Sequence, residues 1–285
     1  MFNSVGITAR LDKEASLELA RTLQEHLERK GLKVYLEHEL AKKIGKTRLA
    51  VSLNEMKTDF VITIGGDGTI LRTILYLPKP EPPILAINMG ERGFLTEVSP
   101  NESIEAVNSC LMGKFTLERH MKLASFLDEK KLPDALNEVF ITSDAPVKLL
   151  YANIWKDNTI IGEVRADALI VATQVGSTAY SLAAGGPLLD PEIDAFVLTP
   201  VCPLSVFHPI VFPSKSTVTI EILRPRKITV VIDGDYREII EAEKPKLRMA
   251  KSMYESSFIR FRTSFYQRLK SRLLSTDGGK NNDDT

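Results

Sequence analysis

Hydrophobic positions in the first part of the chain alternate between strand-like runs and a helical period. Four short runs rich in aliphatic and β-branched residues predict strands, at 4–10, 32–37, 59–64 and 83–89. Between the first two runs, apolar residues recur at helical spacing, namely Leu19, Ala20, Leu23 and Leu27. Helical segments are also expected within 41–57, together with a loop, and at 101–113. Apolar strands that alternate with helices predict a Rossmann-like α/β domain over residues 1–113, built on a parallel sheet.

The pattern changes to short alternating runs from about residue 115 to residue 262. Gly, Pro, Asn and Asp stand at the breaks between runs that predict strands, at 137–142, 148–157, 167–173, 216–223 and 227–234. Few helical periods interrupt these runs. Residues 114–255 are therefore expected to form a second, all-β domain.

A helical period returns near the end of the sequence. Phe265, Leu269 and Leu273 recur at helical spacing among basic residues, which predicts an amphipathic helix. We expect the segment 256–274 to pack back on the first domain rather than to bind a membrane. Residues 275–285 are polar and rich in glycine, and they are expected to form a disordered tail.

Composition limits the classes of partner. The 285 residues are 44% hydrophobic, which is enough for a proper core, and 37 basic residues balance 37 acidic ones. No global field therefore favours nucleic acid or an anionic membrane. No apolar run is long enough for a membrane helix and no signal peptide precedes the first strand, so a cytoplasmic protein is expected. Cys110 and Cys202 lack CxxC spacing and are expected to be reduced structural thiols.

A glycine-rich turn with an acid inside it, TIGGDGTIL at 63–71, follows the third predicted strand. Gly65 and Gly66 let the backbone approach a phosphate, and the helix expected to begin near Thr69 directs its first unpaired N–H groups to the same place. The turn does not fit the GxxxxGK[ST] of a P-loop or the longer GxGxxG pattern. An ordinary structural turn is the alternative. The position between an apolar strand and a helix favours phosphate binding.

Asp67 is the unusual member of this turn, because a carboxylate repels phosphate. It can accept the proton of an attacking hydroxyl group, or it can position a magnesium ion that bridges phosphates. Arg72, one turn along the helix, could meet phosphate charge, although an exposed helical arginine is as often only solvated. Asp67 is therefore the candidate catalytic residue of a phosphoryl transfer.

Two further stretches carry candidate binding residues in the second domain. Asn137 and Glu138 begin a predicted strand, where both can serve one ligand only at a strand end or a bulge. Two solvated residues after a turn are the alternative. The stretch 167–189 runs from a buried strand into a Gly-Ser-Thr turn, a helix start and a Gly-Gly-Pro stop. Its small residues and single tyrosine suit a flat heteroaromatic ligand, and close helix packing explains them equally well.

These stretches together resemble the NAD kinase family, whose GGDG turn also occurs in diacylglycerol and sphingosine kinases and in phosphofructokinases. The resemblance spans 5–273 and rests on GGDGT at 65–69, the Asn137-Glu138 pair, GSTAYSLAAGGP at 176–187, and Asp233-Gly234. The GSTAY block separates this family from the lipid kinases, which lack it. The resemblance implies an α/β domain plus a β-sandwich, with the last helix returning to the first domain, and a homodimer or homotetramer.

The resemblance also implies a reaction. ATP, or polyphosphate in some members, would phosphorylate the 2′-hydroxyl of the adenosine ribose of NAD to give NADP, with Mg²⁺ carried by the donor. Asp67 would be the general base or the acid that organises the metal. The implied residues for phosphate and ATP are Gly65, Gly66, Gly68, Thr69 and Arg72. The implied residues for NAD are Phe94, Asn137, Glu138, Asp167, Val175, Thr178, Ala179, Tyr180, Ala183 and Asp235.

Several of these NAD-binding residues have an implied partner. The Asn137-Glu138 pair would hold ribose hydroxyls, and Phe94, Thr178 and Ala179 would meet the adenine. Tyr180 would meet the nicotinamide side. Asp167 would bind an amide or amine group of NAD, across a subunit boundary.

The chain departs from the family pattern at a few positions. Gln174 and Val175 stand where the family usually has proline and then a hydroxyl residue, so a contact to the nicotinamide ribose would be lost. Glu91 and Arg92 alter the charge near the pocket, and Asp235 stands where glutamine is common. Two other functions share part of this pattern. GSTAYSLAAGGP disfavours a lipid or sugar kinase, and the retained acid of the GGDG turn disfavours a dinucleotide-binding regulatory protein without turnover.

Overall fold

The computed structural model describes residues 2–90, 93–145 and 148–261. Glu91, Arg92, the predicted last helix and the predicted tail lie outside the described residues. The chain forms two compact units. Unit 1 comprises Met1–Ile70, Pro82–Glu118 and the described residues from Phe258 onward. Unit 2 comprises Leu71–Glu81 and Arg119–Ser257.

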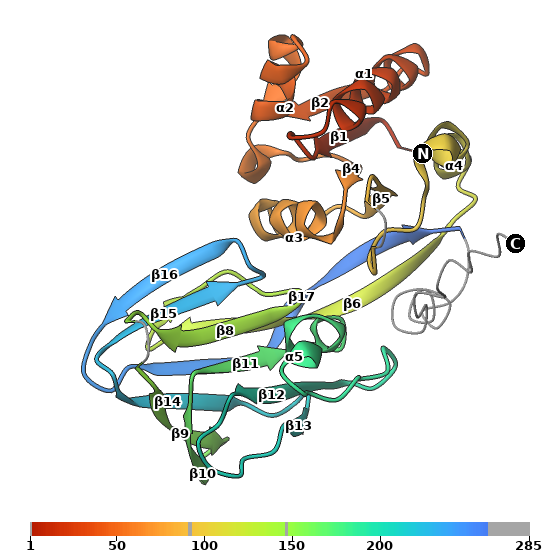
Figure 1. Ribbon diagram of the computed structural model, residues 1–285. Helices are drawn as coiled ribbons and strands as arrows, with labels where there is room; N and C mark the ends of the chain where they lie inside the picture. Colours follow the sequence, from red (N-terminus) through yellow and green to blue (C-terminus); the bar gives the residue numbers. More distant parts are fainter. Residues whose placement is uncertain (1, 91–92, 146–147, 262–285) are drawn as a thin grey trace, which may run out of the picture. The chain divides into compact units, whose positions relative to one another are not determined.

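Unit 1 is built on a parallel sheet. Its strands are β1 (Ser4–Ala9), β2 (Lys33–Glu37), β3 (Ala50–Val51), β4 (Phe60–Gly65) and β5 (Ile84–Asn88). The order is β5-β4-β1-β2-β3, and each of these pairings is parallel (Figure 1). Every residue of β4 is buried, as its continuous apolar run predicts for a strand covered on both faces. The predicted α/β domain with a parallel sheet is confirmed.

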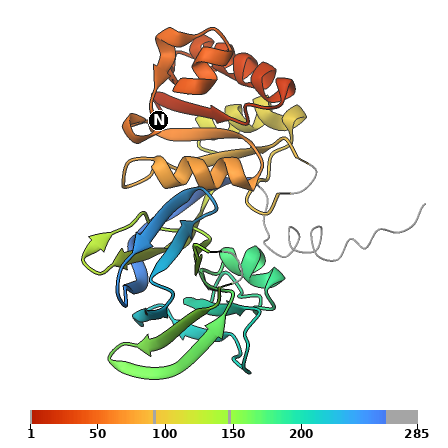
Figure 2. The same ribbon diagram turned by 60° about the vertical axis from the view of Figure 1, so that its left-hand side comes forward.

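Helices connect these strands. They are α1 (Glu14–Arg29), α2 (His38–Lys43), α3 (Asp67–Tyr76) and α4 (Ser103–Leu111), with 3₁₀ turns η1 (Thr47–Leu49), η2 (Leu53–Glu55) and η3 (Pro100–Glu102). Helix α1 lies along β1 and β2 (Figures 1 and 2) and buries Leu17, Ala20, Leu23 and Leu27. Helix α2 ends at Lys43, and the loop expected within 41–57 begins there, because Gly45 takes a positive φ of 70° just beyond the C-cap residue Ile44.

Unit 2 contains two sheets. The first has the order β10-β9-β14-β17, with β6 paired to β17 and β7 to β6; the second has the order β13-β12-β11-β8-β15-β16. The first six strands that follow unit 1's α/β part are β6 (Thr116–Leu127), β7 (Lys130–Lys131), β8 (Glu138–Ser143), β9 (Leu150–Lys156), β10 (Thr159–Ala166) and β11 (Ala168–Ala172). After η4 (Gly176–Thr178) and α5 (Tyr180–Ala183), the remaining strands are β12 (Ala195–Val201), β13 (Ile210–Pro213), β14 (Val218–Arg224), β15 (Lys227–Ile232), β16 (Tyr236–Glu241) and β17 (Lys246–Arg260).

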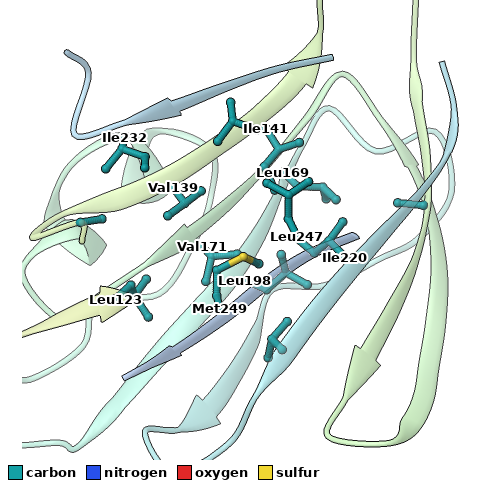
Figure 3. Close-up of a cluster of buried hydrophobic side chains, with 14 of the residues drawn as sticks. Leu123, Val139, Ile141, Leu169, Val171, Leu198, Ile220, Ile232, Leu247 and Met249 are labelled. Atoms are coloured by element: carbon teal, nitrogen blue, oxygen red, sulfur yellow. The ribbon is translucent and has the colours of Figure 1, made fainter. Parts of the chain in front are cut away.

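The core of unit 2 lies between its two sheets, as in a β-sandwich. Side chains of both sheets meet there, among them Val139, Leu169 and Leu198 from one sheet and Ile220 and Met249 from the other (Figure 3). Strands β9 and β14 bury alternate residues, which is the period-2 pattern of a strand with one face on a core. The predicted all-β architecture is confirmed.

The structure corrects one boundary and shows a strand at another. Leu75, within the segment 71–81 that was expected in the first domain, belongs to the core cluster of unit 2. At the other end, the described residues from Phe258 onward do belong to unit 1, as expected of the returning segment 256–274, and β17 runs through residues 256–260 before the predicted helix. Buried residues alternate along much of β17, and Phe258 pairs in parallel with Ile84 of β5 in unit 1, so this stretch has a strand's contacts.

Both cysteines are free, and they differ in exposure. Cys110 is buried, and burial raises the pKa of its thiol to about 12. Cys202 is exposed, so burial supports the expected structural role for Cys110 alone. Within the described ranges, no helix is both long and apolar enough to cross a membrane.

Candidate functional site

The glycine-rich turn of unit 1 joins β4 directly to α3. Strand β4 ends at Gly65 and α3 begins at Asp67, two residues earlier than Thr69, where the sequence placed the start. The backbone carbonyl of Gly66 accepts hydrogen bonds from the N–H groups of Thr69 (3.0 Å) and Ile70 (3.3 Å). Because the first N–H groups of a helix have no partner within it, the turn offers donors and a positive dipole end to an anion. Asp67 itself stands in the first helical turn.

The glycines of the turn have different structural roles. A Cβ at Gly65 would come within 2.3 Å of the Thr69 hydroxyl oxygen, so local packing excludes a side chain there. A Cβ at Gly66 or Gly68 would meet nothing within 4 Å in the described part of the chain, and neither residue has a positive φ. The protein's own packing thus does not explain glycine at these two positions.

Two backbone N–H groups hold the Asp67 carboxylate. Phe94 donates to Oδ2 at 2.9 Å and Leu95 donates to Oδ1 at 3.0 Å. Gly93 makes this approach possible, since a Cβ there would lie 1.9 Å from the hydroxyl oxygen of Thr96 and 3.2 Å from Asp67 Oδ1. The structure therefore brings together Asp67, the candidate catalytic residue, and Phe94, which the family resemblance assigns to the adenine. The side chain of Phe94 is buried.

In unit 2, a buried aspartate accepts hydrogen bonds from the backbone at the start of β8. Asp233 accepts hydrogen bonds from the backbone N–H groups of Leu136 (2.7 Å), Asn137 (2.8 Å) and Glu138 (3.0 Å). Burial raises the pKa of Asp233 to about 6, and the three donors oppose that rise. Sequence reasoning missed this residue as a site member, because Asp233-Gly234 also matches an ordinary hairpin turn between β15 and β16.

The Asn137-Glu138 pair is buried or nearly so rather than solvated. Asn137 is 7% exposed. Its Oδ1 and the Oε2 of Glu138 are buried atoms with no hydrogen-bond partner among the described residues. Burial, and then the charge of Asp233, raises the pKa of Glu138 to about 8. Buried polar atoms are normally satisfied, so these two are candidates for contact with a ligand.

The GST turn packs on the same backbone. A Cβ at Gly176 would lie 2.0 Å from the carbonyl oxygen of Asn137, so only glycine fits this approach. Thr173 links the two stretches as well: its N–H donates to the Asn137 carbonyl at 2.9 Å and its hydroxyl to the Leu136 carbonyl at 2.6 Å. The separately predicted NE pair and GSTAY block thus form one local cluster.

The hydroxyl groups of the turn are engaged with its own backbone. Thr178 donates to the carbonyl of Val175 at 2.8 Å, and Ser177 donates to that of Gln174 at 2.6 Å. The side chains of Val175 and Thr178 are buried. Gln174 donates through Nε2 to the carbonyl of Ile193 at 2.6 Å, so this departure from the family pattern has a structural use.

The remaining predicted NAD-binding residues of unit 2 present accessible surface. Ala179 is half-buried, and the exposed residues are Asp167, Tyr180, Ala183 and Asp235. The Tyr180 ring lies 5.4 Å from the ring of Phe140. Asp235 interacts with the hydroxyl of Tyr76, and burial followed by this hydrogen bond raises the pKa of Tyr76.

Metal-binding capacity in the described residues is limited. They contain no group of three or more His, Cys, Asp or Glu side chains arranged to hold a metal ion. Magnesium is commonly held by one or two carboxylates plus substrate phosphates, and the Asp67 carboxylate beside an anion-binding turn fits that donor set.

Comparison with known proteins gives consistent matches. The model of the ATP-NAD kinase N-terminal domain matches residues 5–115, and that of the ATP-NAD kinase C-terminal domain matches residues 136–261. The NAD kinase of Methanothermobacter thermautotrophicus is 37% identical over 278 residues, covering 96% of this chain and 97% of that protein. The NAD kinase of Pyrococcus abyssi is 39% identical over 272 residues, covering 94% and 98%.

Solved structures show the same likeness. Yeast NADH kinase complexed with NADH superposes with a TM-score of 0.88 at 22% identity, covering 99% of this chain and 90% of that one, which is a likeness of fold. An NAD kinase from Archaeoglobus fulgidus in complex with ATP gives a TM-score of 0.75 at 26% identity, covering 94% and 99%.

Proposed function

The chain belongs to the NAD kinase family, and from that premise we propose how its residues phosphorylate NAD to NADP with ATP. The proposal assigns the acid of the reaction to Asp67 and the phosphate contacts to the turn around it. The observation that carries it is the pairing of a carboxylate fixed by two N–H donors with glycines that the protein's packing does not require.

The turn of unit 1 would take the phosphates of ATP. Gly65, Gly66 and Gly68 keep side chains away from them, and the first N–H groups of α3 donate to their oxygens. Thr69 and Arg72 follow on the same helix and add a hydroxyl group and a positive charge. Mg²⁺ bound with ATP would neutralise phosphate charge and help align the transferring group.

Asp67 would serve the acceptor. Backbone N–H groups hold both carboxylate oxygens in place, and the negative charge of the carboxylate lets it take the proton of the ribose 2′-hydroxyl. The 2′ oxygen of the ribose then bonds to the γ-phosphorus, while the bond between that phosphorus and the bridging oxygen of ADP breaks. Asp67 could instead orient the magnesium ion, and both roles require its negative charge.

The cluster of unit 2 would bind NAD. Glu138, with a pKa of about 8, carries a proton near neutral pH, so it can donate to one ribose hydroxyl and accept from another. Asn137 offers its unpaired Oδ1 to the same sugar. Phe94, Val175, Thr178, Ala179, Tyr180, Ala183, Asp167 and Asp235 complete the set of NAD contacts that we propose.

The chain is further proposed to work as a cytoplasmic homodimer or homotetramer. Leu204 and Val206, 68% and 88% exposed, stand on the loop after β12. Phe207 of this loop lies beside β10, where the exposed side chains of Ile160 and Ile161 extend the apolar surface. We call these five residues the β10 patch. An exposed apolar patch of this kind fits a second copy of the chain. Two free cysteines agree with a reducing compartment.

The test is NADP formation by the purified protein, with NAD or NADH as acceptor and ATP or polyphosphate as donor, with magnesium and with a chelator. Asp67→Asn should still bind NAD while its kcat falls by about 10² or more, because the carboxylate's charge is lost. The matched control is Asp59→Asn, since Asp59 also accepts two backbone N–H bonds, from Asn3 and Ser4. A nearly unchanged rate in Asp67→Asn would refute the role of this residue. If the unaltered protein binds NAD but forms no NADP, it is a binding protein that has lost the catalytic activity.

A further inference from the structure

Arg260 is a buried cation at the end of β17, in the same unit as Asp67. Its side chain is 4% exposed. Nε donates to the carboxylate of Glu118, Nη1 lies 3.9 Å from Glu97 Oε2, and the guanidinium lies 4.9 Å from the centre of the Phe258 ring. A buried charge is tolerated only when it is paired and hydrogen-bonded, so these contacts hold the guanidinium in one place.

One further hydrogen bond of Arg260 leads toward the catalytic turn. Nη1 donates to the backbone carbonyl of Leu95 at 2.8 Å. The N–H of the same residue, Leu95, donates to Asp67 Oδ1, and the N–H of the preceding Phe94 donates to Oδ2. The Leu95 backbone therefore contacts the buried guanidinium through its carbonyl and the Asp67 carboxylate through its N–H.

We propose that Arg260 is a positioning residue for Asp67. Its guanidinium fixes the Leu95 carbonyl, and this orients the 93–95 backbone so that two N–H groups converge on the carboxylate. A carboxylate held through both oxygens keeps one orientation, as a base or a metal-organising acid requires. The proposal rests on the proposed function, because it assigns Arg260 an effect through Asp67.

Arginine suits this task better than lysine. The planar guanidinium can donate to a carboxylate through Nε and to a carbonyl through Nη1 at fixed angles, whereas an ammonium group is a point charge on a flexible stem. Arg260→Lys therefore keeps the charge opposite Glu118 while loosening the bond to Leu95. Removing the charge altogether would take the guanidinium cation away from the partly buried carboxylates of Glu97 and Glu118, so Arg260→Lys, which keeps the charge, is the informative substitution.

The decisive experiment is a double-mutant cycle between Arg260→Lys and Asp67→Asn, with NADP formation as the readout. Arg260→Lys should lower kcat by about tenfold, the size of one lost hydrogen bond, with the KM values for NAD and ATP unchanged. In the Asp67→Asn background the same substitution should change kcat by less than about twofold, because the group through which it acts is gone. A tenfold loss in both backgrounds would overturn the positioning role.

A second readout does not depend on turnover. Amide hydrogen exchange at Phe94 and Leu95 should be faster by about tenfold or more in folded Arg260→Lys than in the unaltered protein. Arg248→Lys is the matched control, because Arg248 lies on the same strand, stacks on Phe126 at 4.2 Å and is exposed. Unchanged exchange at both amides in Arg260→Lys would overturn the proposal. If Arg260→Lys does not fold, Glu118→Gln, which weakens the hold on Nε, takes its place with the same expectations. If the single substitution Asp67→Asn leaves kcat equal to that of the unaltered protein, the result counts instead against the proposed function.

Discussion

Two carboxyl groups in unit 2 occupy the same buried region and have different partners. Asp233 accepts three backbone N–H groups, which stabilise its charged form. Glu138 has an unpartnered buried oxygen, and the charge of Asp233 adds to the cost of ionising it. Asp233 therefore loses its proton first, and Glu138 remains a neutral acid up to about pH 8.

This difference predicts a pH dependence of stability. The pKa of Glu138 rises from 4.5 to about 8 on folding, so between these values the folded chain holds a proton that the unfolded chain has released. The free energy of unfolding should thus fall as pH rises through this window, by at most about 1.4 kcal/mol per pH unit from this group. Glu138→Gln should flatten the slope in urea titrations across the window. Glu129→Gln, at an exposed position, should leave it unchanged. Equal slopes in the Glu138→Gln and unaltered proteins would contradict the assignment.

The sequence could predict some site residues but not their partners. Asp67 stands out in a printed sequence, since an acid inside a glycine turn conflicts with phosphate binding. Asp233 was noted only as part of the family pattern, because its three donors lie 95 to 97 residues away and no local pattern encodes that contact. Arg260 was passed over for the same reason, as its bond to Leu95 spans 165 residues.

At the scale of elements, glycine has two separate functions in this chain. Gly176 allows the η4 turn to approach the backbone at Asn137, where a Cβ would lie 2.0 Å from the carbonyl oxygen. Gly66 stands between β4 and α3, where a Cβ would meet nothing within 4 Å among the described residues. The fold requires the first glycine, and the second is the one that we propose leaves room for a phosphate.

A pair of substitutions separates these functions. Gly176→Ala should destabilise the protein by about 1–3 kcal/mol or more, because an extra methyl group must displace the Asn137 backbone. Gly66→Ala should change the free energy of unfolding by less than about 0.5 kcal/mol while kcat/KM for ATP falls by about tenfold or more, since the methyl group occupies phosphate space. Urea denaturation and steady-state kinetics measure the two effects. Full activity in a stable Gly66→Ala protein would show that the turn has only a structural role and does not bind phosphate at Gly66.

Elements with clear periodicity were predictable, and those defined by distant contacts were not. The apolar run of β4 and the stripe of α1 are local patterns, and both elements formed where expected. Residues 257–260 precede a helical period, yet they form strand because Phe258 pairs with Ile84. Lys122 is another case: it is a fully buried lysine on β6 whose charge is met by Glu81, 41 residues earlier.

At the scale of the whole molecule, the change from a helical period to alternating runs correctly predicted an α/β part followed by an all-β part. The boundary between units was harder to place. Helix α3 starts in unit 1 with Asp67 and continues into unit 2, where Leu75 joins the sandwich core. A continuous helix gives no sign in its sequence of where one core ends and the next begins.

The β10 patch gives a prediction for assembly. If a second copy covers Leu204 and Val206, replacing both by aspartate places two charges in the contact, and their desolvation opposes association. Light scattering should give a dimer or tetramer mass for the unaltered protein and a smaller mass for Leu204→Asp/Val206→Asp, with the thermal midpoint of unit 2 retained or only slightly lowered. Met253→Asp is the matched control, because Met253 is 83% exposed on β17 and lies outside the patch. Loss of assembly in the control as well, or a monomeric unaltered protein, would show that the patch is not the contact between copies. Because Asp167 was expected to reach NAD across a subunit boundary, a smaller assembly should also bind NAD more weakly.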